Sequence, residues 1–308
     1  MAEFINVPSF TVIMPKCDAE MDMIRRVYEK LIKSYRDSCR HEGSKLKKCT
    51  QFLVICLFCN IKEVVGKRNI IMPSYDGEWI LIDTTKLKKL SHVPTPLDAH
   101  HGTKEHKKEL KEIYTYKEFV EIEKGDVVVD VGAYVGAFSL LASNKASKVL
   151  AIDPGAVINS SLQRNVKDYD NIKVSKRACW KNNQKMSLNI SLSQNDNSLL
   201  DVDDEAFDIG RSIIVEANTL EKIALNNDLK VINFLKVEAE GVEPEVLEGA
   251  LGGSIEVEKI SINCGAERDG REPTEDVLNI LKSHNYKCRV NRTDIWNAPI
   301  VFGRKMNT

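Results

Sequence analysis

Six short apolar runs alternate with helical stretches in the second part of the chain, and this alternation limits the possible folds more than any other feature. The runs are rich in β-branched residues and lie at residues 127–131, 149–152, 172–174, 213–215, 231–236 and 260–263. Strands separated by helices in this way form an α/β fold with a mostly parallel sheet covered on both faces. Residues 286–290 and 299–303 are separated by only a short turn, so we expect an antiparallel hairpin there.

The first 111 residues have a different pattern. Apolar side chains at helical spacing predict a helix over residues 18–40 and a second, buried helix over residues 44–65. Residues 70–72 and 79–82 flank an Asp-Gly turn, which predicts a β-hairpin. Residues 91–111, with two Pro and four His, predict a solvated loop that enters a helix. We therefore divide the chain into a helical and β-hairpin N-terminal region, 1–111, and a second domain, 112–308.

The charges nearly cancel, with 44 Lys and Arg against 45 Asp and Glu, so the chain as a whole is not attracted to nucleic acid or anionic membranes. The balance is uneven, because residues 1–111 hold 20 basic and 14 acidic side chains, whereas residues 112–308 hold 24 and 31. The longest apolar run, residues 52–59, is too short to span a bilayer. We expect a cytoplasmic protein without a membrane span, and the pattern predicts no particular oligomeric state.

The strongest local motif runs from Gly125 to Gly136, where an apolar strand enters a glycine turn and then a helix. Its pattern is D-x-G-x-x-x-G, with Asp130, Gly132 and Gly136 as the defining residues. A dinucleotide site has G-x-G-x-x-G instead, and a carboxylate at this place would repel a pyrophosphate. The motif therefore favours a ligand with a cationic group, which Asp130 can bind while Gly132 allows the backbone to approach.

A second acid, Asp153, ends the next apolar run, 23 positions after Asp130. An acid at the end of the second strand can hold both ribose hydroxyls of a nucleoside. A glycine pair alone would favour a plain strand-to-helix turn, but the second acid reverses that preference. Together the two acids indicate a nucleoside with an amino-acid arm, which is S-adenosylmethionine.

The run at residues 231–236 ends in a third group of polar residues, Lys236, Glu238 and Glu240. The carboxyl ends of parallel strands share one crevice, and strand alternation would keep both glutamates on one side, so one of them would have a raised pKa suited to a general base. Two alternatives remain open. The glutamates could cap the helix that begins near Pro244, or they could bind Mg²⁺ together with Asn263.

These segments together resemble a known family. The runs VVVDVGAYVGAFSL, AIDPGAVINSSLQRNV, ANTLEKI and INFLKVEAEGVEPEVLEGA are similar to the FkbM family of S-adenosylmethionine-dependent methyltransferases over about residues 114–250. The resemblance implies a class I, Rossmann-like fold, in which a seven-stranded, mostly parallel sheet has an antiparallel last strand. It also implies methyl transfer, usually to a hydroxyl oxygen.

The resemblance assigns roles to individual residues. Its cofactor-binding positions are Asp130, Gly132, Ala133, Tyr134 and Gly136 in the first motif, followed by Asp153 and Pro154 at the ribose. Its Lys-x-x-x-Glu-Gly signature matches Lys236, Glu240 and Gly241. Two departures concern the acceptor side, because Glu238 and Asn263 stand where the family commonly has Asp and Glu. Glu238 has a longer reach than the usual Asp, which changes what its role can be, and Asn263 suggests a different acceptor pocket.

We therefore predict a methyltransferase that uses S-adenosylmethionine to methylate a hydroxyl on a glycan or small metabolite, with Lys236, Glu238 and Glu240 as the catalytic residues. Residues 1–111 would shape the acceptor side or serve an interaction. Two alternatives remain. The lysines of the N-terminal region could bind RNA as the substrate, although they lack interleaved aromatic residues, or the domain could bind a nucleoside without catalysis.

Overall fold

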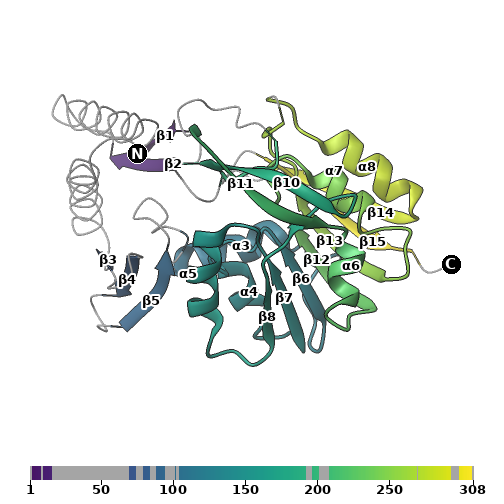
Figure 1. Ribbon diagram of the computed structural model, residues 1–308, viewed down its shortest axis with the longest axis horizontal. Helices are drawn as coiled ribbons and strands as arrows, with labels where there is room; N and C mark the ends of the chain where they lie inside the picture. The colour runs from purple at the N-terminus through teal and green to yellow at the C-terminus, as the bar shows by residue number, and fades with distance from the viewer. Residues whose placement is uncertain are drawn as a thin grey trace.

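A sheet of seven strands forms the centre of the protein (Figure 1). The computed structural model describes residues 2–7, 10–15, 69–73, 79–83, 88–93, 101, 104–191, 196–200, 208–268, 270–292 and 298–306. The strand order is β14-β15-β13-β12-β6-β7-β8. In chain order these strands are β6 (Val127–Val131), β7 (Lys148–Ile152), β8 (Ile172–Ser175), β12 (Val231–Val237), β13 (Glu256–Asn263), β14 (Tyr286–Arg292) and β15 (Pro299–Lys305).

The pairing of these strands confirms the predicted sheet. Strands β13, β12, β6, β7 and β8 are parallel neighbours, whereas β15 runs antiparallel to both β13 and β14. The last strand is thus the antiparallel one, and β14 and β15 form the predicted hairpin. This topology brings the carboxyl ends of β7, β6, β12 and β13 to one edge of the sheet.

Helices cover both faces of the sheet (Figure 1). One face packs against α3 (Lys104–Tyr114), α4 (Ala137–Ala142) and α5 (Ala156–Val166), and the other against α6 (Leu220–Leu225), α7 (Glu243–Glu248) and α8 (Thr274–Ser283). Strand alternation explains the division, because Val128 belongs to the core beneath α3 and α4, while Val129 belongs to the opposite core. The same strands therefore contribute side chains to both cores.

A second, smaller sheet contains the apolar run at residues 213–215, which we had assigned to the parallel sheet. That assignment is wrong. The run lies in β11 (Asp208–Asn218), which pairs antiparallel with β10 (Gln184–Ser191) and parallel with β9 (Ala178–Cys179). Ile214 is 69% exposed, so this run is not the fully buried strand that a central parallel sheet requires.

The described part of the N-terminal region consists of strands. The predicted hairpin is confirmed as β3 (Asn69–Pro73) with β4 (Trp79–Asp83), to which a third strand, β5 (Lys88–Val93), is added. An additional hairpin joins β1 (Ala2–Val7) and β2 (Phe10–Pro15). The predicted helices over residues 18–40 and 44–65 lie outside the described residues.

The segment predicted as a solvated loop, residues 91–111, contacts helix α5. His92 and His106 are both buried, because β5 continues to Val93 and α3 begins at residue 104. The Asn165 side chain on α5 accepts a hydrogen bond from the His92 backbone nitrogen (2.6 Å) and donates one to the His92 carbonyl (2.9 Å). Helix α3 runs across the predicted boundary at residues 111 and 112, and the division into two domains stays a prediction.

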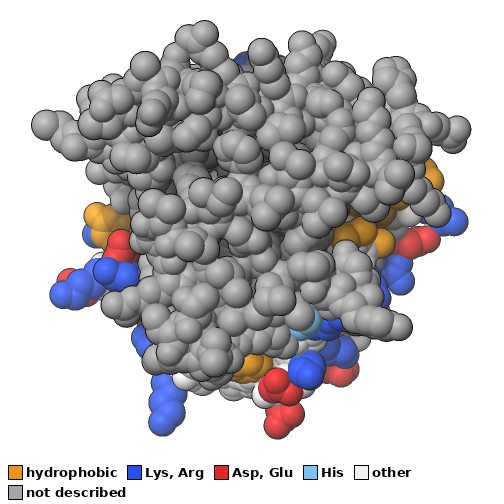
Figure 2. Space-filling model, turned by 90° about the vertical axis from the view of Figure 1, so that its left-hand side faces the viewer, with side chains coloured by type: hydrophobic (Ala, Val, Ile, Leu, Met, Phe, Trp, Pro, Cys, Tyr) orange, Lys and Arg blue, Asp and Glu red, His pale blue; other side chains and the backbone are white. Residues whose placement is uncertain are grey.

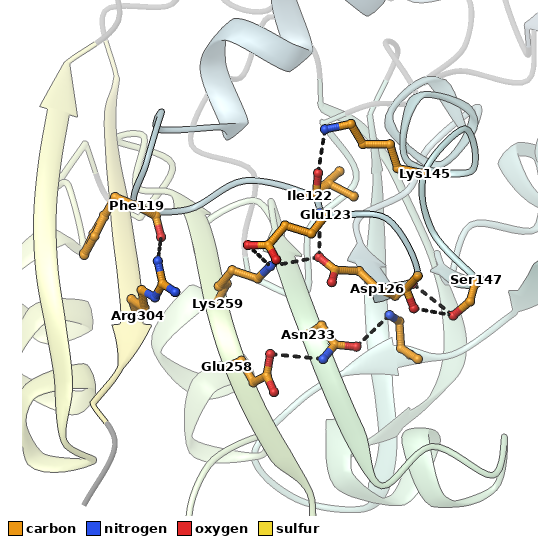
Figure 3. A network of polar contacts seen from close by, with 12 residues as sticks. Phe119, Ile122, Glu123, Asp126, Lys145, Ser147, Asn233, Glu258, Lys259 and Arg304 are labelled. Atoms are coloured by element: carbon orange, nitrogen blue, oxygen red, sulfur yellow. Dashed lines mark hydrogen bonds and ion pairs between the residues drawn. The ribbon is translucent and has the colours of Figure 1, made fainter.

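A network of polar contacts closes the amino-terminal edge of the sheet (Figure 3). Lys259, only 4% exposed, pairs with Glu123 (3.3 Å) and Asp126 (2.9 Å). Asn233 accepts a hydrogen bond from the Val127 nitrogen at the start of β6. These contacts tie the segment that precedes β6 to β12 and β13, at the edge opposite the polar residues of the predicted site.

The surface of the described residues agrees with the near-neutral net charge of −1. Around the rim of the face shown in Figure 2, basic and acidic side chains lie next to one another. None of the helices in the described ranges is long and apolar enough to cross a membrane.

Candidate functional site

The glycine loop between β6 and α4 lies against the end of β12. Gly132 (φ 70°) and Gly136 (φ 88°) both have left-handed backbone conformations, as does Tyr134 between them (φ 49°). A Cβ atom added to Gly132 would lie 1.7 Å from the Glu238 carbonyl oxygen, which is a backbone atom. Only glycine permits this approach. The position predicted from the motif is thus one where the glycine loop lies directly against the chain after β12.

Lys236 joins the glycine loop to two carboxylates. Its ammonium nitrogen lies 3.2 Å from Asp130 Oδ1 and 3.1 Å from Glu238 Oε2, and it donates a hydrogen bond to the Gly132 carbonyl (2.8 Å). Burial would lower the pKa of Lys236, but the two carboxylates outweigh burial and raise it. Lys236 is therefore charged, and the glycine loop depends on that charge.

Asp130 is completely buried, so its environment differs from the one expected from the motif. Its Oδ2 accepts a hydrogen bond from Ser139 (2.7 Å), and its Oδ1 faces Lys236. Burial raises the pKa of Asp130, and these two contacts offset part of the rise. The cation beside Asp130 in this structure is Lys236, so a ligand cation would share the carboxylate with an internal partner. Ser139, nine positions after Asp130, was not singled out from the sequence.

Asp153 follows β7 and connects the second predicted motif to the first. Its Oδ2 accepts a hydrogen bond from the Tyr134 nitrogen (3.1 Å), and its Oδ1 accepts one from the Gly155 nitrogen (2.8 Å). Burial raises its pKa to about 6 in spite of these bonds. Ala133 donates from its backbone to the Ile152 carbonyl, and Pro154 lies between Asp153 and Gly155. The predicted ribose residues and the glycine loop thus form one continuous site.

Glu238 lies just beyond β12 among three partners. Asn263 donates a hydrogen bond to its Oε1 (3.3 Å), Lys236 pairs with its Oε2, and the Tyr114 hydroxyl lies within hydrogen-bonding reach. Burial would raise the pKa of Glu238, but Lys236 and the hydrogen bonds lower it overall. Tyr114 ends α3 and is completely buried. The sequence analysis missed Tyr114, because nothing in its local pattern separates it from an ordinary core tyrosine.

Glu240 has a different environment, and the alternation argument that grouped it with Glu238 is wrong. Strand β12 ends at Val237, and Glu240 has a left-handed backbone (φ 51°) in the following turn. Alternation of side chains applies only within the strand. Burial raises the pKa of Glu240 well above its usual range, and the nearby carboxylates, Glu267 foremost, add to the rise. The pKa values of the two glutamates are thus shifted in opposite directions.

The side chains of the predicted site are therefore gathered at the carboxyl ends of three neighbouring strands. Asp130 lies near the end of β6, Asp153 follows β7, Lys236 lies near the end of β12, and the two glutamates follow it. A seven-stranded sheet in this order, with one antiparallel strand and a glycine loop after β6, defines a class I methyltransferase fold.

Comparison with known proteins identifies the family. The model of the methyltransferase FkbM domain matches residues 130–288, which is more than half of the chain. The chain therefore belongs to the FkbM methyltransferase family. No curated protein matches it.

Solved structures similar to this chain are distant in sequence. The methyltransferase FkbM from Methylobacillus flagellatus KT shares 17% identity at a TM-score of 0.44, over 67% of this chain and 54% of that one. The present chain thus spans about half the length of that protein. A putative tRNA methyltransferase from Streptococcus pneumoniae, solved in complex with S-adenosyl-L-methionine, shares 13% identity at a TM-score of 0.40, over 65% of this chain and 74% of that one.

Proposed function

We propose that this protein transfers a methyl group from S-adenosylmethionine to a hydroxyl oxygen of a small metabolite or glycan. The observation that carries the proposal is the continuous polar edge formed by Asp130, the Gly132 loop and Asp153, with Glu240 in the turn after the adjacent strand. Donor and acceptor must meet in a near-attack geometry, and neighbouring strand ends provide such a rigid frame.

The residues present fit the cofactor. Gly132 allows the glycine loop to lie directly against the Glu238 backbone, next to Lys236. Each Asp153 carboxylate oxygen accepts one backbone hydrogen bond, and a carboxylate oxygen has capacity for a second donor, so Asp153 can still receive both ribose hydroxyls. Lys236 holds Asp130 and the loop in position. When bound, S-adenosylmethionine supplies an electrophilic methyl group.

The proton of the acceptor hydroxyl passes to a carboxylate in this proposal, and Glu240 is the better candidate. Its raised pKa makes it a stronger base than an ordinary carboxylate. Glu238 has a lowered pKa and is committed to Lys236 and Asn263, which suits a positioning role. Substituting Glu240→Gln should preserve cofactor binding and abolish turnover. Turnover at the wild-type rate would remove Glu240 from the mechanism.

Isothermal titration of the full chain with S-adenosylmethionine, and in parallel with NADH, tests the proposal. We expect micromolar binding of the first alone. Gly132→Ala should weaken this binding at least 100-fold, because the new Cβ meets the Glu238 backbone. Gly125→Ala is the matched control. It lies before the same strand at positive φ, and its added Cβ would meet nothing within 4 Å. Binding of NADH, or of neither molecule, would contradict the proposal.

RNA stays the alternative acceptor. Most of the lysines that suggested it lie outside the residues whose side chains are described, while Lys108 and Lys111 are exposed on α3. A parallel assay with unmodified tRNA as the acceptor separates the two. Methylation of tRNA in preference to small hydroxyl compounds would favour RNA.

A further inference from the structure

Three loops converge at the carboxyl edge of the sheet, on the side of the predicted acceptor. They contain residues 196–200, 238–243 and 263–268. Ser198 donates a hydrogen bond to the Glu240 carbonyl (2.8 Å), and Arg268 donates one to the Gly241 carbonyl (2.9 Å). A Cβ on Gly241 would lie 3.2 Å from the Glu267 backbone. These three loops are therefore in contact with one another, and we call them the acidic loop cluster.

The acidic loop cluster is rich in carboxylates. Burial raises the pKa of Glu267 to about 8 and that of Glu243 to about 7, and the neighbouring carboxylates raise the pKa of Glu267 further. The same loops also bring Asp196, Glu238 and Glu240 together. Among the described residues, the nearby cations are already committed, because Lys236 pairs with Asp130 and Glu238, and Arg268 binds Glu245 (2.6 Å).

The acidic loop cluster also contains a buried hydrogen-bond acceptor without a donor. Asn263 is 8% exposed, and its Oδ1 makes no hydrogen bond with any described residue, although its Nδ2 is bound to Glu238. Glu243 is 1% exposed, and its Oε2 also makes no hydrogen bond with any described residue. An unsatisfied buried acceptor costs free energy. A ligand that brings both N–H donors and positive charge would satisfy these oxygens and the acids.

We propose that the methyl acceptor carries a protonated amine close to its reacting hydroxyl, and that Glu267 and Asn263 Oδ1 bind this amine. This inference rests on the proposed methyltransferase function and adds the substrate class. Glu240 remains the base for the hydroxyl. S-adenosylmethionine has a net charge of only +1, whereas a second cation beside Glu267 and Glu243 would favour their ionised forms and lower their raised pKa values. A metal ion is the weaker candidate, because no group of three or more His, Cys, Asp or Glu among the described residues could hold one.

The test uses matched pairs of hydroxyl compounds that differ in charge. The full chain is assayed for S-adenosylhomocysteine formation with glucosamine against N-acetylglucosamine, and with 2-amino-1,3-propanediol against glycerol. We expect kcat/KM at least tenfold higher for the amines. Glu267→Gln should lower kcat/KM for each amine about tenfold relative to its neutral partner compound, mainly through KM. Glu256→Gln is the matched control, because Glu256 is exposed at the opposite end of β13.

Several results would overturn the inference. Equal turnover of the neutral compounds and the amines would exclude recognition of a cation. The same conclusion would follow if the protein binds S-adenosylmethionine but methylates neither amine. Activity that is lost in EDTA and restored by Mg²⁺ would assign the acidic site to a metal instead. Failure of the proposed function itself is seen separately, as absence of S-adenosylmethionine binding in the titration.

Discussion

At the scale of single residues, the site depends on one buried ammonium group. Lys236 is 2% exposed and faces Asp130, Glu238 and the Gly132 carbonyl at once. A buried charge is tolerated only with good partners. Here the partners come from the end of β6 with its glycine loop and from the end of β12, so the lysine joins the cofactor side of the predicted site to its acceptor side.

Replacement of Lys236 by methionine should strongly destabilise the folded protein. The Lys236→Met variant keeps the aliphatic volume but leaves Asp130 buried without a cation, and we expect a loss of about 3–5 kcal/mol in the free energy of unfolding. Urea denaturation measures this loss. Adding Asp130→Asn should restore part of the stability by removing the uncompensated charge. A single-variant loss below about 1 kcal/mol would show that the buried pair is not stabilising.

At the scale of elements, α3 supplies the residue that links the region before the second domain to the site. Tyr114, at the end of this helix, is within hydrogen-bonding reach of Glu238, and its ring centroid lies 5.3 Å from the Lys236 ammonium nitrogen. A hydrogen bond to a carboxylate is stronger than one between neutral groups. Helix α3 therefore contributes to the electrostatics of the site as well as to the core beneath it.

Loss of the Tyr114 hydroxyl tests this link. Tyr114→Phe should raise the pKa of Glu238, because the nearby hydroxyl helps to lower it, and it should reduce the free energy of unfolding by about 1 kcal/mol. Chemical denaturation and NMR titration of the carboxyl measure the two effects. Tyr116→Phe is the control, because the Tyr116 ring packs against Phe119 and Phe302. Equal effects of the two substitutions would contradict the assigned role.

The contact between β5 and α5 gives a second prediction for elements. The Asn165 side chain bonds the His92 nitrogen and carbonyl and also the Val135 carbonyl (2.9 Å). We expect Asn165→Ala to increase hydrogen–deuterium exchange in residues 88–93, at a cost of about 1–3 kcal/mol. Gln163→Ala, on the exposed side of the same helix, should leave the exchange unchanged. Unchanged exchange in both variants would mean that other contacts hold β5.

At the scale of the whole molecule, the buried carboxylates determine how stability depends on pH. Asp153, Glu243 and Glu267 have pKa values raised by burial, to about 6, 7 and 8. The folded protein therefore retains protons that the unfolded chain has released, and the free energy of unfolding falls as pH rises through this range. Denaturation between pH 5 and 8 measures the slope, and Glu267→Gln should flatten its upper part. A rise in stability over this window would contradict the assignment.

The sequence predicted the central sheet well because its strands follow simple rules. The run at residues 127–131 coincides with β6, since a fully buried strand is continuously apolar. The β10–β11 pair was missed because its exposed strands alternate weakly, and Ile214 resembles a core residue by type alone. Gly132 and Asp153 could be predicted from motif spacing. Tyr114 and Glu267 could not, because their roles arise from contacts between segments far apart in the sequence.

The approach of Gly132 to the Glu238 carbonyl has a consequence for how this chain can diverge. The atom that excludes a side chain at position 132 belongs to the main chain, so no change of residue type at position 238 can make room for one. Compensation would require a different path for the chain after β12, through an insertion or deletion. Relatives with a larger residue at the equivalent of position 132 should therefore differ in loop length after that strand.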